Sequence, residues 1–207
     1  AKMRVCLIAG REHCHTTLDS AVEAALRGGV RAVHLRDKRA TTRELYEMGL
    51  RLRQLARNDD ALLVINDRAD IAVAVKADGV HLGWQSLPVS EVRRIVGPKA
   101  LVGKSVHNLA EAQQAVADGV DYVIVSPIFE SPSKAGLVPT LGIEGLSEIR
   151  CHIGLPIIAL GGIDQSNASE VIRAGADGIA VIRAILAADD PAAAAARLCL
   201  CASVSGP

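Results

Sequence analysis

Short apolar runs alternate along this chain with longer segments in which apolar and polar positions recur at helical spacing. A short run without polar alternation is typical of a strand that is buried on both faces of a parallel sheet. The pattern predicts eight such strands, separated by helices, at residues 4–8, 32–35, 62–66, 79–82, 100–103, 122–125, 156–160 and 178–181.

A weak internal repetition links these elements. Alanine-rich helical segments end in glycine directly before a strand at residues 27–30, 117–120 and 173–176. Glycine after a helix end adopts the left-handed conformation that turns the chain back toward the sheet. This repetition predicts a single-domain (β/α)8 TIM barrel over residues 1–207, with an open doubly wound sheet as the alternative fold. We expect the tail, residues 197–207, to be frayed.

The amino-acid composition disfavours several classes of function. Half of the residues are hydrophobic and 2% are aromatic, which suits one core of aliphatic side chains. Lys and Arg total 23, as do Asp and Glu, so no net charge favours nucleic acid or a membrane surface. We expect no membrane span and no signal peptide. Five cysteines without CxxC spacing favour reduced thiols and a cytoplasmic protein, and the sequence leaves open whether it forms a homo-oligomer.

In a TIM barrel the chemistry lies where the strands end. His34, Arg36 and Lys38 are spaced by two, so in an extended strand their side chains project to one side, toward the barrel mouth. Arg36 and Lys38 could also be ordinary solvated charges. Together with Ser105 and Lys134 at the ends of other strands, they favour a site for an anion.

Other polar residues at predicted strand ends each have two interpretations. Asn66 and Asp67 either line the mouth or cap the next helix. His81, between apolar neighbours, is interpreted as a core histidine. His107 directly precedes Asn108, a good helix N-cap, and could be a plain loop residue.

Two loop segments also carry polar groups. The segment with Ser131, Ser133 and Lys134 is either a flexible turn or a lid that grips an anion. His13 and His15 are metal-ligand types, but they have no partner cluster in the sequence, so we interpret both as surface residues.

The stretch from residue 156 to residue 185 has a further pattern. Two short buried strands each open into a loop or a helix start, at Gly161-Gly162 and at Ile182-Arg183. Exposed backbone N–H groups at such positions form the phosphate site that many TIM barrels carry after their last two strands. The sequence therefore predicts a phosphorylated small molecule as the ligand.

Six motifs occur together in one order and spacing. They are residues 34–38 (HLRDK), 65–68 (INDR), 79–83 (GVHLG), 103–107 (GKSVH), 131–134 (SPSK) and 159–163 (ALGGI). Over nearly its whole length the chain resembles the superfamily of thiamin phosphate synthase and the TenI thiazole tautomerase. The resemblance implies a thiazole phosphate ligand, held by Gly161, Gly162 and the backbone around Ile182 and Arg183.

The synthases of this superfamily join a pyrimidine diphosphate to the thiazole phosphate, and Mg²⁺ neutralises the departing pyrophosphate. The residues that match the synthase pattern are Arg36, Lys38, Asn66, Asp67, Ser105 and Lys134, with Ser131 and Ser133 in place of two threonines. Two positions depart from it. His34 replaces a glutamine that reads the pyrimidine, and Ser86 stands where the second metal-binding Asp belongs. Asp67 is then the remaining metal ligand, and loss of one carboxylate should weaken Mg²⁺ binding.

The TenI reaction is a proton shift that makes a carboxylated dihydrothiazole phosphate aromatic, and it needs no metal or other cofactor. The same cations would bind the carboxylate, and His34 or His107 would carry the proton. Pro127 counts against this activity, because TenI relatives can carry histidine there. A missing metal ligand is harder to replace than a proton shuttle. We therefore expect a thiazole tautomerase, with thiamin phosphate synthase and a non-catalytic thiazole phosphate binding protein as alternatives.

Overall fold

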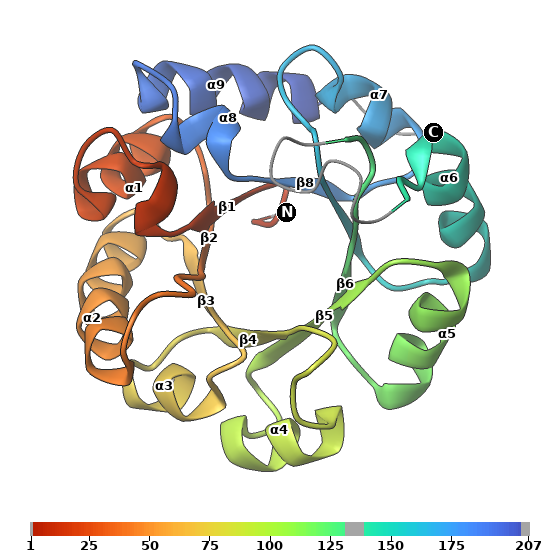
Figure 1. Ribbon diagram of the computed structural model, residues 1–207, viewed down its shortest axis with the longest axis horizontal. Helices are drawn as coiled ribbons and strands as arrows, with labels where there is room; N and C mark the ends of the chain where they lie inside the picture. The colour runs from red at the N-terminus through yellow and green to blue at the C-terminus, as the bar shows by residue number, and fades with distance from the viewer. Residues whose placement is uncertain (1, 131–138, 204–207) are drawn as a thin grey trace.

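The computed structural model describes residues 2–130 and 139–203. Eight parallel strands form a closed barrel in sequence order, in which β8 pairs with β1 (Figure 1). The strands are β1 (Val5–Ala9), β2 (Ala32–Leu35), β3 (Leu62–Asn66), β4 (Gly79–Leu82), β5 (Leu101–Val106), β6 (Tyr122–Val125), β7 (Ile157–Leu160) and β8 (Gly178–Val181). The TIM barrel is confirmed, and the open doubly wound sheet is excluded because the described strands leave no free edge.

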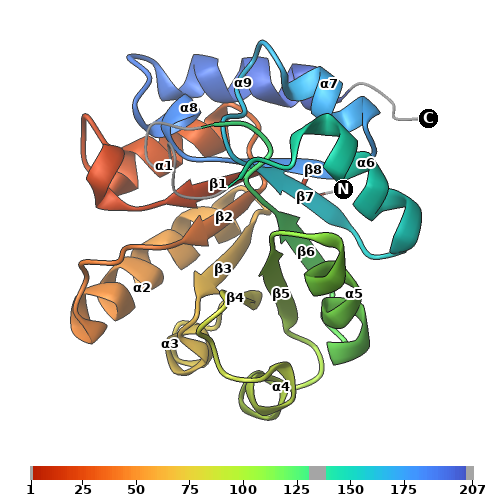
Figure 2. The ribbon, with the colours of Figure 1, turned by 45° about the vertical axis from the view of Figure 1, so that its right-hand side comes forward.

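A ring of helices covers the outside of this barrel (Figures 1 and 2). The described helices are η1 (Arg11–His13), α1 (Leu18–Arg27), α2 (Thr42–Asn58), α3 (Ala69–Ala74), α4 (Val89–Val96), α5 (Leu109–Asp118), α6 (Gly142–His152), α7 (Ala168–Arg173), α8 (Arg183–Leu186) and α9 (Pro191–Ala202). As predicted, glycines after helices have a left-handed backbone, with φ of 102° at Gly29, 78° at Gly119 and 107° at Gly175. None of these helices is long and apolar enough to cross a membrane.

The alternation of side chains along each strand separates two apolar regions. Outward-facing residues such as Leu7 and Val33 are fully buried against the helices in the main core. Inward-facing residues such as Ile8 and Ile124 belong to a second, smaller cluster. Because His34 follows Ala32 of this inner cluster by two residues, the same alternation turns it into the barrel interior.

β5 is longer than the sequence predicts. We expect the strand to end at Gly103, but it continues to Val106 in register with β4 and β6. Lys104 faces outward, where its Nζ lies 2.7 Å from a carboxylate oxygen of Asp118. Pairing with two neighbouring strands therefore overrides the local glycine signal, and Ser105 lies within the strand rather than after it.

The prediction of a frayed end from residue 197 is wrong for residues up to 202. These residues belong to α9, which contacts α1 and α7. Leu198 and Ala202 are buried in the main core. At Gly28 in the turn after α1, an added Cβ would lie 2.6 Å from the Cβ of Ala195. The apolar face of α9 therefore docks closely and orders this end, whereas residues 204–207 lie outside the described residues.

Candidate active site

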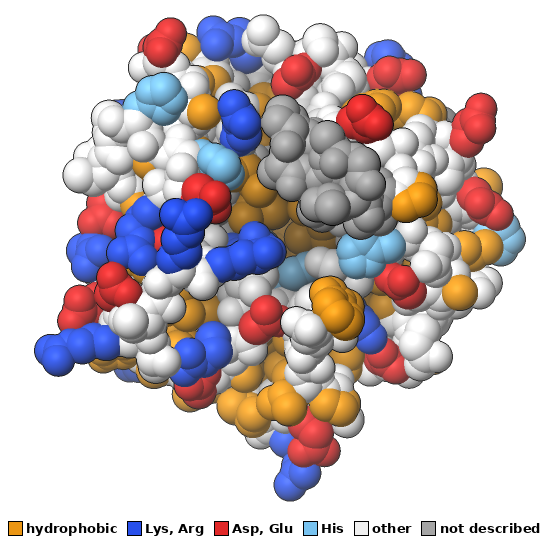
Figure 3. All heavy atoms as spheres, viewed as in Figure 1, with side chains coloured by type: hydrophobic (Ala, Val, Ile, Leu, Met, Phe, Trp, Pro, Cys, Tyr) orange, Lys and Arg blue, Asp and Glu red, His pale blue; other side chains and the backbone are white. Residues whose placement is uncertain are grey.

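The C-terminal ends of the strands open onto a cavity of about 410 Å³ in the barrel mouth. Figure 3 shows a hollow in the middle of this face, with Lys and Arg side chains gathered on the side of β2 and α2 and histidines nearby. The lining includes seven residues that the sequence indicated, namely His34, Arg36, Lys38, Asn66, Asp67, Ser105 and His107. Residues distant in the sequence therefore meet in one site.

The cationic side of the cavity is formed directly after β2. Arg36 and Lys38 line the cavity together with His34, although the strand itself ends at Leu35. Among the described residues, neither Arg36 nor Lys38 forms an ion pair with a carboxylate. Two adjacent cations without carboxylate partners are suited to an anion with several charged oxygens.

The acidic group of the cavity is Asp67, which has a left-handed backbone with φ of 56°. Asp is one of the few residues other than glycine that tolerate this conformation. Its carboxylate accepts hydrogen bonds from Gly83 N at 3.2 Å, from Asn66 Nδ2 at 2.6 Å and from the Ser86 hydroxyl. Neither Asn66 nor Asp67 caps α3, whose N-cap position is occupied by Arg68. The carboxylate and the Ser86 hydroxyl therefore lie together beside the mouth.

His34 is only 2% exposed, and its Nε2 lies 3.2 Å from Oδ1 of Asn66. Since the amide nitrogen of Asn66 donates to Asp67, its oxygen faces His34, and we assign the imidazole proton to Nε2. Nδ1 is then an acceptor that has no partner among the described residues. Burial lowers the pKa of His34 to about 4, against the hydrogen bond to Asn66 and with help from the charge of Arg36. The ring is neutral at pH 7.

A loss of stability in mild acid follows from this buried ring. An unfolded histidine has a pKa near 6.5, so between pH 6.5 and 4 the unfolded chain binds a proton that folded His34 does not. Stability is therefore complete above pH 6.5 and falls by about 2 to 3 kcal/mol toward pH 4.5. Denaturant titrations of the wild type and of His34→Gln at pH 7.5 and 4.5 measure this fall. An equal fall in both proteins would contradict the assignment.

His81 is a core histidine, as expected, but it also lines the cavity. Its Nε2 lies 2.9 Å from Oγ of Ser105, and its Nδ1 lies 3.2 Å from the hydroxyl of Tyr122. Burial lowers the pKa of His81 well below its usual value, and electrostatic repulsion from His34 and Arg36 acts in the same direction. A neutral, buried ring therefore holds the Ser105 hydroxyl in place. Sequence reasoning missed this role, although His81 and His34 occupy the same position in their strands.

His107 lies at the rim of the same cavity. Its Nδ1 is 3.0 Å and its backbone N is 2.8 Å from one carboxylate oxygen of Glu111, in the first turn of α5. Asn108 caps α5, as the sequence predicts, by accepting a hydrogen bond from Glu111 N at 2.9 Å. The helix start therefore holds His107 at the rim.

A second cavity, of about 520 Å³, is lined by Gly161, Gly162, Ile182 and Arg183, the four residues predicted to hold a phosphate. Gly161 and Gly162 have left-handed backbones, with φ of 112° and 61°. A Cβ added at Gly162 would lie 2.5 Å from the carbonyl oxygen of Glu130, which requires glycine at this turn.

The two cavities adjoin, because Leu160 and Ile182 line both of them. His13, which the sequence suggested as a surface residue, lines the second cavity. Trp84, the single tryptophan of the sequence, lines the first cavity and is 82% exposed. Its position just after the predicted strand at residues 79–82 was a signal to which the sequence analysis assigned no role.

Three predicted anion-binding residues, Ser131, Ser133 and Lys134, lie outside the described residues. The structure therefore places the site without them. The other predicted residues line one or both of the adjoining cavities, except Ser86, which contacts Asp67 without lining either.

The sequence was compared with protein families and with known proteins, and the following matches are named as the same synthase. The sequence model of the thiamine monophosphate synthase family matches residues 5–185. The chain is 49% identical over 196 residues to thiamine-phosphate synthase of Chloroflexus aurantiacus, covering 95% of this chain and 88% of the relative. It is 46% identical over 177 residues to that of Moorella thermoacetica, covering 86% and 84%.

Comparison with solved structures also finds a thiamine phosphate pyrophosphorylase among the similar proteins. Thiamine phosphate pyrophosphorylase of Pyrococcus furiosus superposes with a TM-score of 0.89 at 38% identity, covering 97% of this chain and 96% of that chain. Crystalline 3-hexulose-6-phosphate synthase superposes with a TM-score of 0.70 at 18% identity, which shows the shared fold alone.

These relatives overturn the expectation of a TenI-like tautomerase, because the similar proteins are named as synthases. That expectation gave too much weight to the missing Asp at Ser86. A protein commonly binds Mg²⁺ with one or two carboxylates plus phosphate oxygens of the substrate, so one lost carboxylate does not exclude the metal. The chain belongs to the thiamine monophosphate synthase family.

Proposed function

We propose that this protein is a thiamine phosphate synthase, which joins hydroxymethylpyrimidine diphosphate to thiazole phosphate and releases pyrophosphate. The adjoining cavities carry the proposal. One is lined by two cations and a carboxylate, the other by a glycine turn, and they meet at Leu160 and Ile182. A diphosphate ester and a phosphate ester can therefore bind side by side. A cytoplasmic location is part of the proposal, since all five cysteines are free thiols.

The proposed reaction breaks the C–O bond between the pyrimidine methylene and the diphosphate. The lone pair of the thiazole nitrogen then forms a C–N bond to this methylene, and no proton leaves the nitrogen. Arg36 and Lys38 hold the diphosphate and offset its growing charge. Ser105, held by His81 at 2.9 Å, presents its hydroxyl to the cationic centre. No general base is needed, so neither His34 nor His107 acts as a proton carrier.

The residues beside the mouth fit Mg²⁺. Asp67 offers one carboxylate, with the Ser86 hydroxyl against it. The described residues contain no cluster of three or more metal-binding side chains, so diphosphate oxygens would complete the coordination. When bound, Mg²⁺ neutralises charge on the leaving pyrophosphate. Asp67 would hold the metal, with the cations Arg36 and Lys38 nearby in the same cavity.

His34 is suited to recognise the pyrimidine in place of the glutamine of the synthase pattern. Its Nδ1 is a buried acceptor without a partner among the described residues, and the residue lines the first cavity. An amino group on the pyrimidine would supply the missing donor. Because the ring stays neutral at pH 7, it offers this acceptor without adding a charge next to Arg36.

A direct assay tests the proposed function. The protein is incubated with the pyrimidine diphosphate, thiazole phosphate and Mg²⁺, and both pyrophosphate and thiamine phosphate are quantified. We expect equal amounts of the two products, and none when either substrate is omitted or the metal is chelated. Tight binding of thiazole phosphate without pyrophosphate release would instead indicate a non-catalytic binding protein.

Restoring the absent carboxylate should strengthen metal binding. Ser86→Asp places a second carboxylate beside Asp67, and we expect the Mg²⁺ concentration for half-maximal pyrophosphate release to fall about tenfold. Without metal the two carboxylates repel each other, so the variant should unfold at a lower temperature until Mg²⁺ is added. Ser86→Asn is the matched control, since it has nearly the same shape without the charge. Equal metal dependence in both variants would contradict the prediction.

A further inference from the structure

The two cations of the first cavity lie in residues 36–41, a loop between β2 and α2 that contains neither strand nor helix. The proposed function requires Arg36 and Lys38 to hold a diphosphate in one position. Long charged side chains on a loop lose considerable conformational entropy when they do so. The contacts that fix this loop therefore affect how tightly it binds an anion.

Asp37, between the two cations, anchors the start of the loop. Its side chain is 6% exposed, and its Oδ2 lies 2.6 Å from Nε and 3.3 Å from the backbone N of Arg11. Its Oδ1 accepts a hydrogen bond from Arg39 N at 3.0 Å. Burial raises the pKa of Asp37, but the hydrogen bonds from Arg11 and Arg39 outweigh it, so the carboxylate is charged at pH 7.

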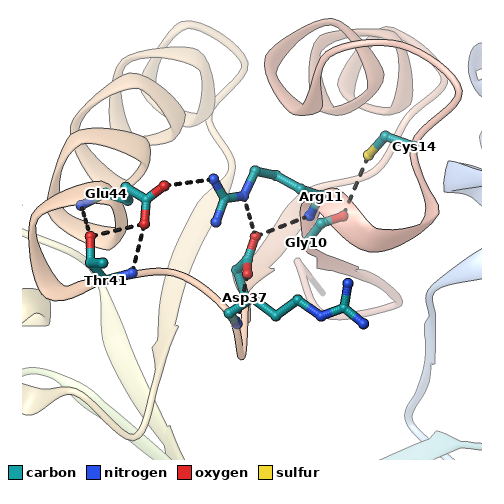
Figure 4. A network of polar contacts seen from close by, with 7 residues as sticks. Gly10, Arg11, Cys14, Asp37, Thr41 and Glu44 are labelled. Atoms are coloured by element: carbon teal, nitrogen blue, oxygen red, sulfur yellow. Dashed lines mark hydrogen bonds and ion pairs between the residues drawn. The ribbon is translucent and has the colours of Figure 1, made fainter.

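The same guanidinium anchors the end of the loop. Nη1 of Arg11 lies 3.0 Å from Oε1 of Glu44, while Oε2 of Glu44 accepts from Thr41 N at 2.7 Å in the capping box of α2. Figure 4 shows Arg11 between Asp37 and Glu44. One arginine, the first residue of η1 after β1, therefore joins both ends of the loop after β2.

The backbones of the two loops are also in close contact. Arg36 N donates to the carbonyl oxygen of Ala9 at 2.8 Å. A Cβ added at Gly10 would lie 2.5 Å from the carbonyl oxygen of Arg36. The segment that carries Arg11 is thus pressed against the segment that carries Arg36.

The ion pair also determines which charges remain available. Asp37 is the carboxylate closest in sequence to Arg36 and Lys38, and without Arg11 it could pair with either of them. Arg11 occupies Oδ2 and the Arg39 backbone occupies Oδ1. Among the described residues, Arg36 and Lys38 have no carboxylate partner and line the cavity.

We propose that Arg11 is a positioning residue: through Asp37 and Glu44 it holds the β2–α2 loop and leaves Arg36 and Lys38 free for the diphosphate. The inference rests on the proposed function for the identity of the anion. Arg11 acts through Asp37 and needs no contact with substrate. Its side chain is 44% exposed, but that of Asp37 is 6% exposed, so removal of the Arg11 side chain leaves a largely buried carboxylate with backbone donors alone and lowers stability.

Binding of inorganic pyrophosphate with Mg²⁺, measured by calorimetry, tests the proposal independently of turnover. We expect Arg11→Ala to raise the dissociation constant about tenfold, equivalent to about 1.4 kcal/mol. The KM for the pyrimidine diphosphate should rise in proportion, while the KM for thiazole phosphate changes little and the variant remains folded with a lower melting temperature.

Arg51→Ala is the matched control. Arg51 lines the same groove between α1 and α2 as Arg11, and its Nε lies 2.6 Å from Oδ2 of Asp19. This variant loses the same charge and an Nε–carboxylate ion pair of the same length, without any change to the loop. We expect it to bind pyrophosphate like the wild type. An equal loss of binding in Arg11→Ala and Arg51→Ala would overturn the proposal.

Asp37→Asn separates positioning from net charge. Removal of a negative charge between two cations should tighten pyrophosphate binding if only the electrostatic field mattered. If the carboxylate positions the loop, binding should weaken about fivefold. Binding that is unchanged or tighter in a folded Asp37→Asn would overturn the proposal, and if this variant does not fold, the comparison of Arg11→Ala with Arg51→Ala decides.

Turnover and pyrophosphate binding, measured together, distinguish a wrong proposed function from a wrong role for Arg11. A wild type that binds pyrophosphate but releases none from the pyrimidine diphosphate would overturn the proposed function. The dissociation constants of Arg11→Ala and Arg51→Ala for pyrophosphate would still test the role of Arg11. Full synthase activity together with unaltered pyrophosphate binding in Arg11→Ala would overturn the role of Arg11 alone. A wild type that binds no pyrophosphate would overturn both.

Discussion

Asp67→Asn should lower the rate of Mg²⁺-dependent pyrophosphate release about 10³-fold, equivalent to about 4 kcal/mol in the activation barrier. Asp67 is the carboxylate on the wall of the first cavity, so the amide removes the one charged protein ligand proposed for the metal. Asn also tolerates the left-handed backbone, with φ of 56° at this position, so the fold should persist. Steady-state rates over a range of Mg²⁺ concentrations measure the effect.

The control for this substitution is Asp70→Asn. Asp70 lies three residues further on, and its carboxylate pairs with Arg68 rather than lining the cavity. We expect near wild-type turnover for this control. Titration of Mn²⁺ by electron paramagnetic resonance should show weaker binding to Asp67→Asn alone. Retention of full Mg²⁺-dependent activity in Asp67→Asn would rule out Asp67 as the metal ligand.

The KM for thiazole phosphate should rise at least about 30-fold in Gly162→Ala, equivalent to about 2 kcal/mol. The structure gives the reason. Gly162 has φ of 61°, and its added Cβ would lie 2.5 Å from the carbonyl oxygen of Glu130 and 2.7 Å from Cβ of Phe129. The turn must move away from the segment after β6, which displaces the N–H groups proposed to bind the phosphate. Initial rates at saturating pyrimidine diphosphate give this KM.

Gly97→Ala controls for backbone strain. Gly97 also has a left-handed backbone, with φ of 81°, but an added Cβ there meets no atom within 4 Å, and the residue follows α4 away from both cavities. Both variants should lose stability through strained φ, whereas only Gly162→Ala should lose affinity for thiazole phosphate. Equal KM values in the two variants would remove the glycine turn from the phosphate site.

Local patterns were sufficient to predict the architecture. Strands buried on both faces are continuous apolar runs, and helix ends that need a left-handed residue carry glycine, as at Gly29, Gly119 and Gly175. Both signals depend on a few neighbouring residues, so they can be read without the partner elements. The length of β5 and the order of α9 depend instead on pairing and docking with distant segments, and there the sequence-based predictions were wrong.

Part of the site was also predictable. Alternation along β2 indicated that His34, Arg36 and Lys38 share one side, and the three do line one cavity. The six motifs indicated the superfamily, and the family match agrees. The choice of the tautomerase was wrong, because a count of carboxylates in the sequence cannot include the oxygens that a bound diphosphate supplies to Mg²⁺.

Taken alone, the sequence predicted the eight-strand barrel and the superfamily, which are confirmed, and proposed a site at the barrel mouth. Only the tertiary structure decided that His81 holds Ser105, that Arg11 ties Asp37 to Glu44, and that the two cavities share a wall. The physical reason is the range of the interactions. Periodicity and backbone conformation arise between near neighbours in the chain. These contacts join residues 24, 26 and 33 positions apart, which the pairing of neighbouring strands brings together.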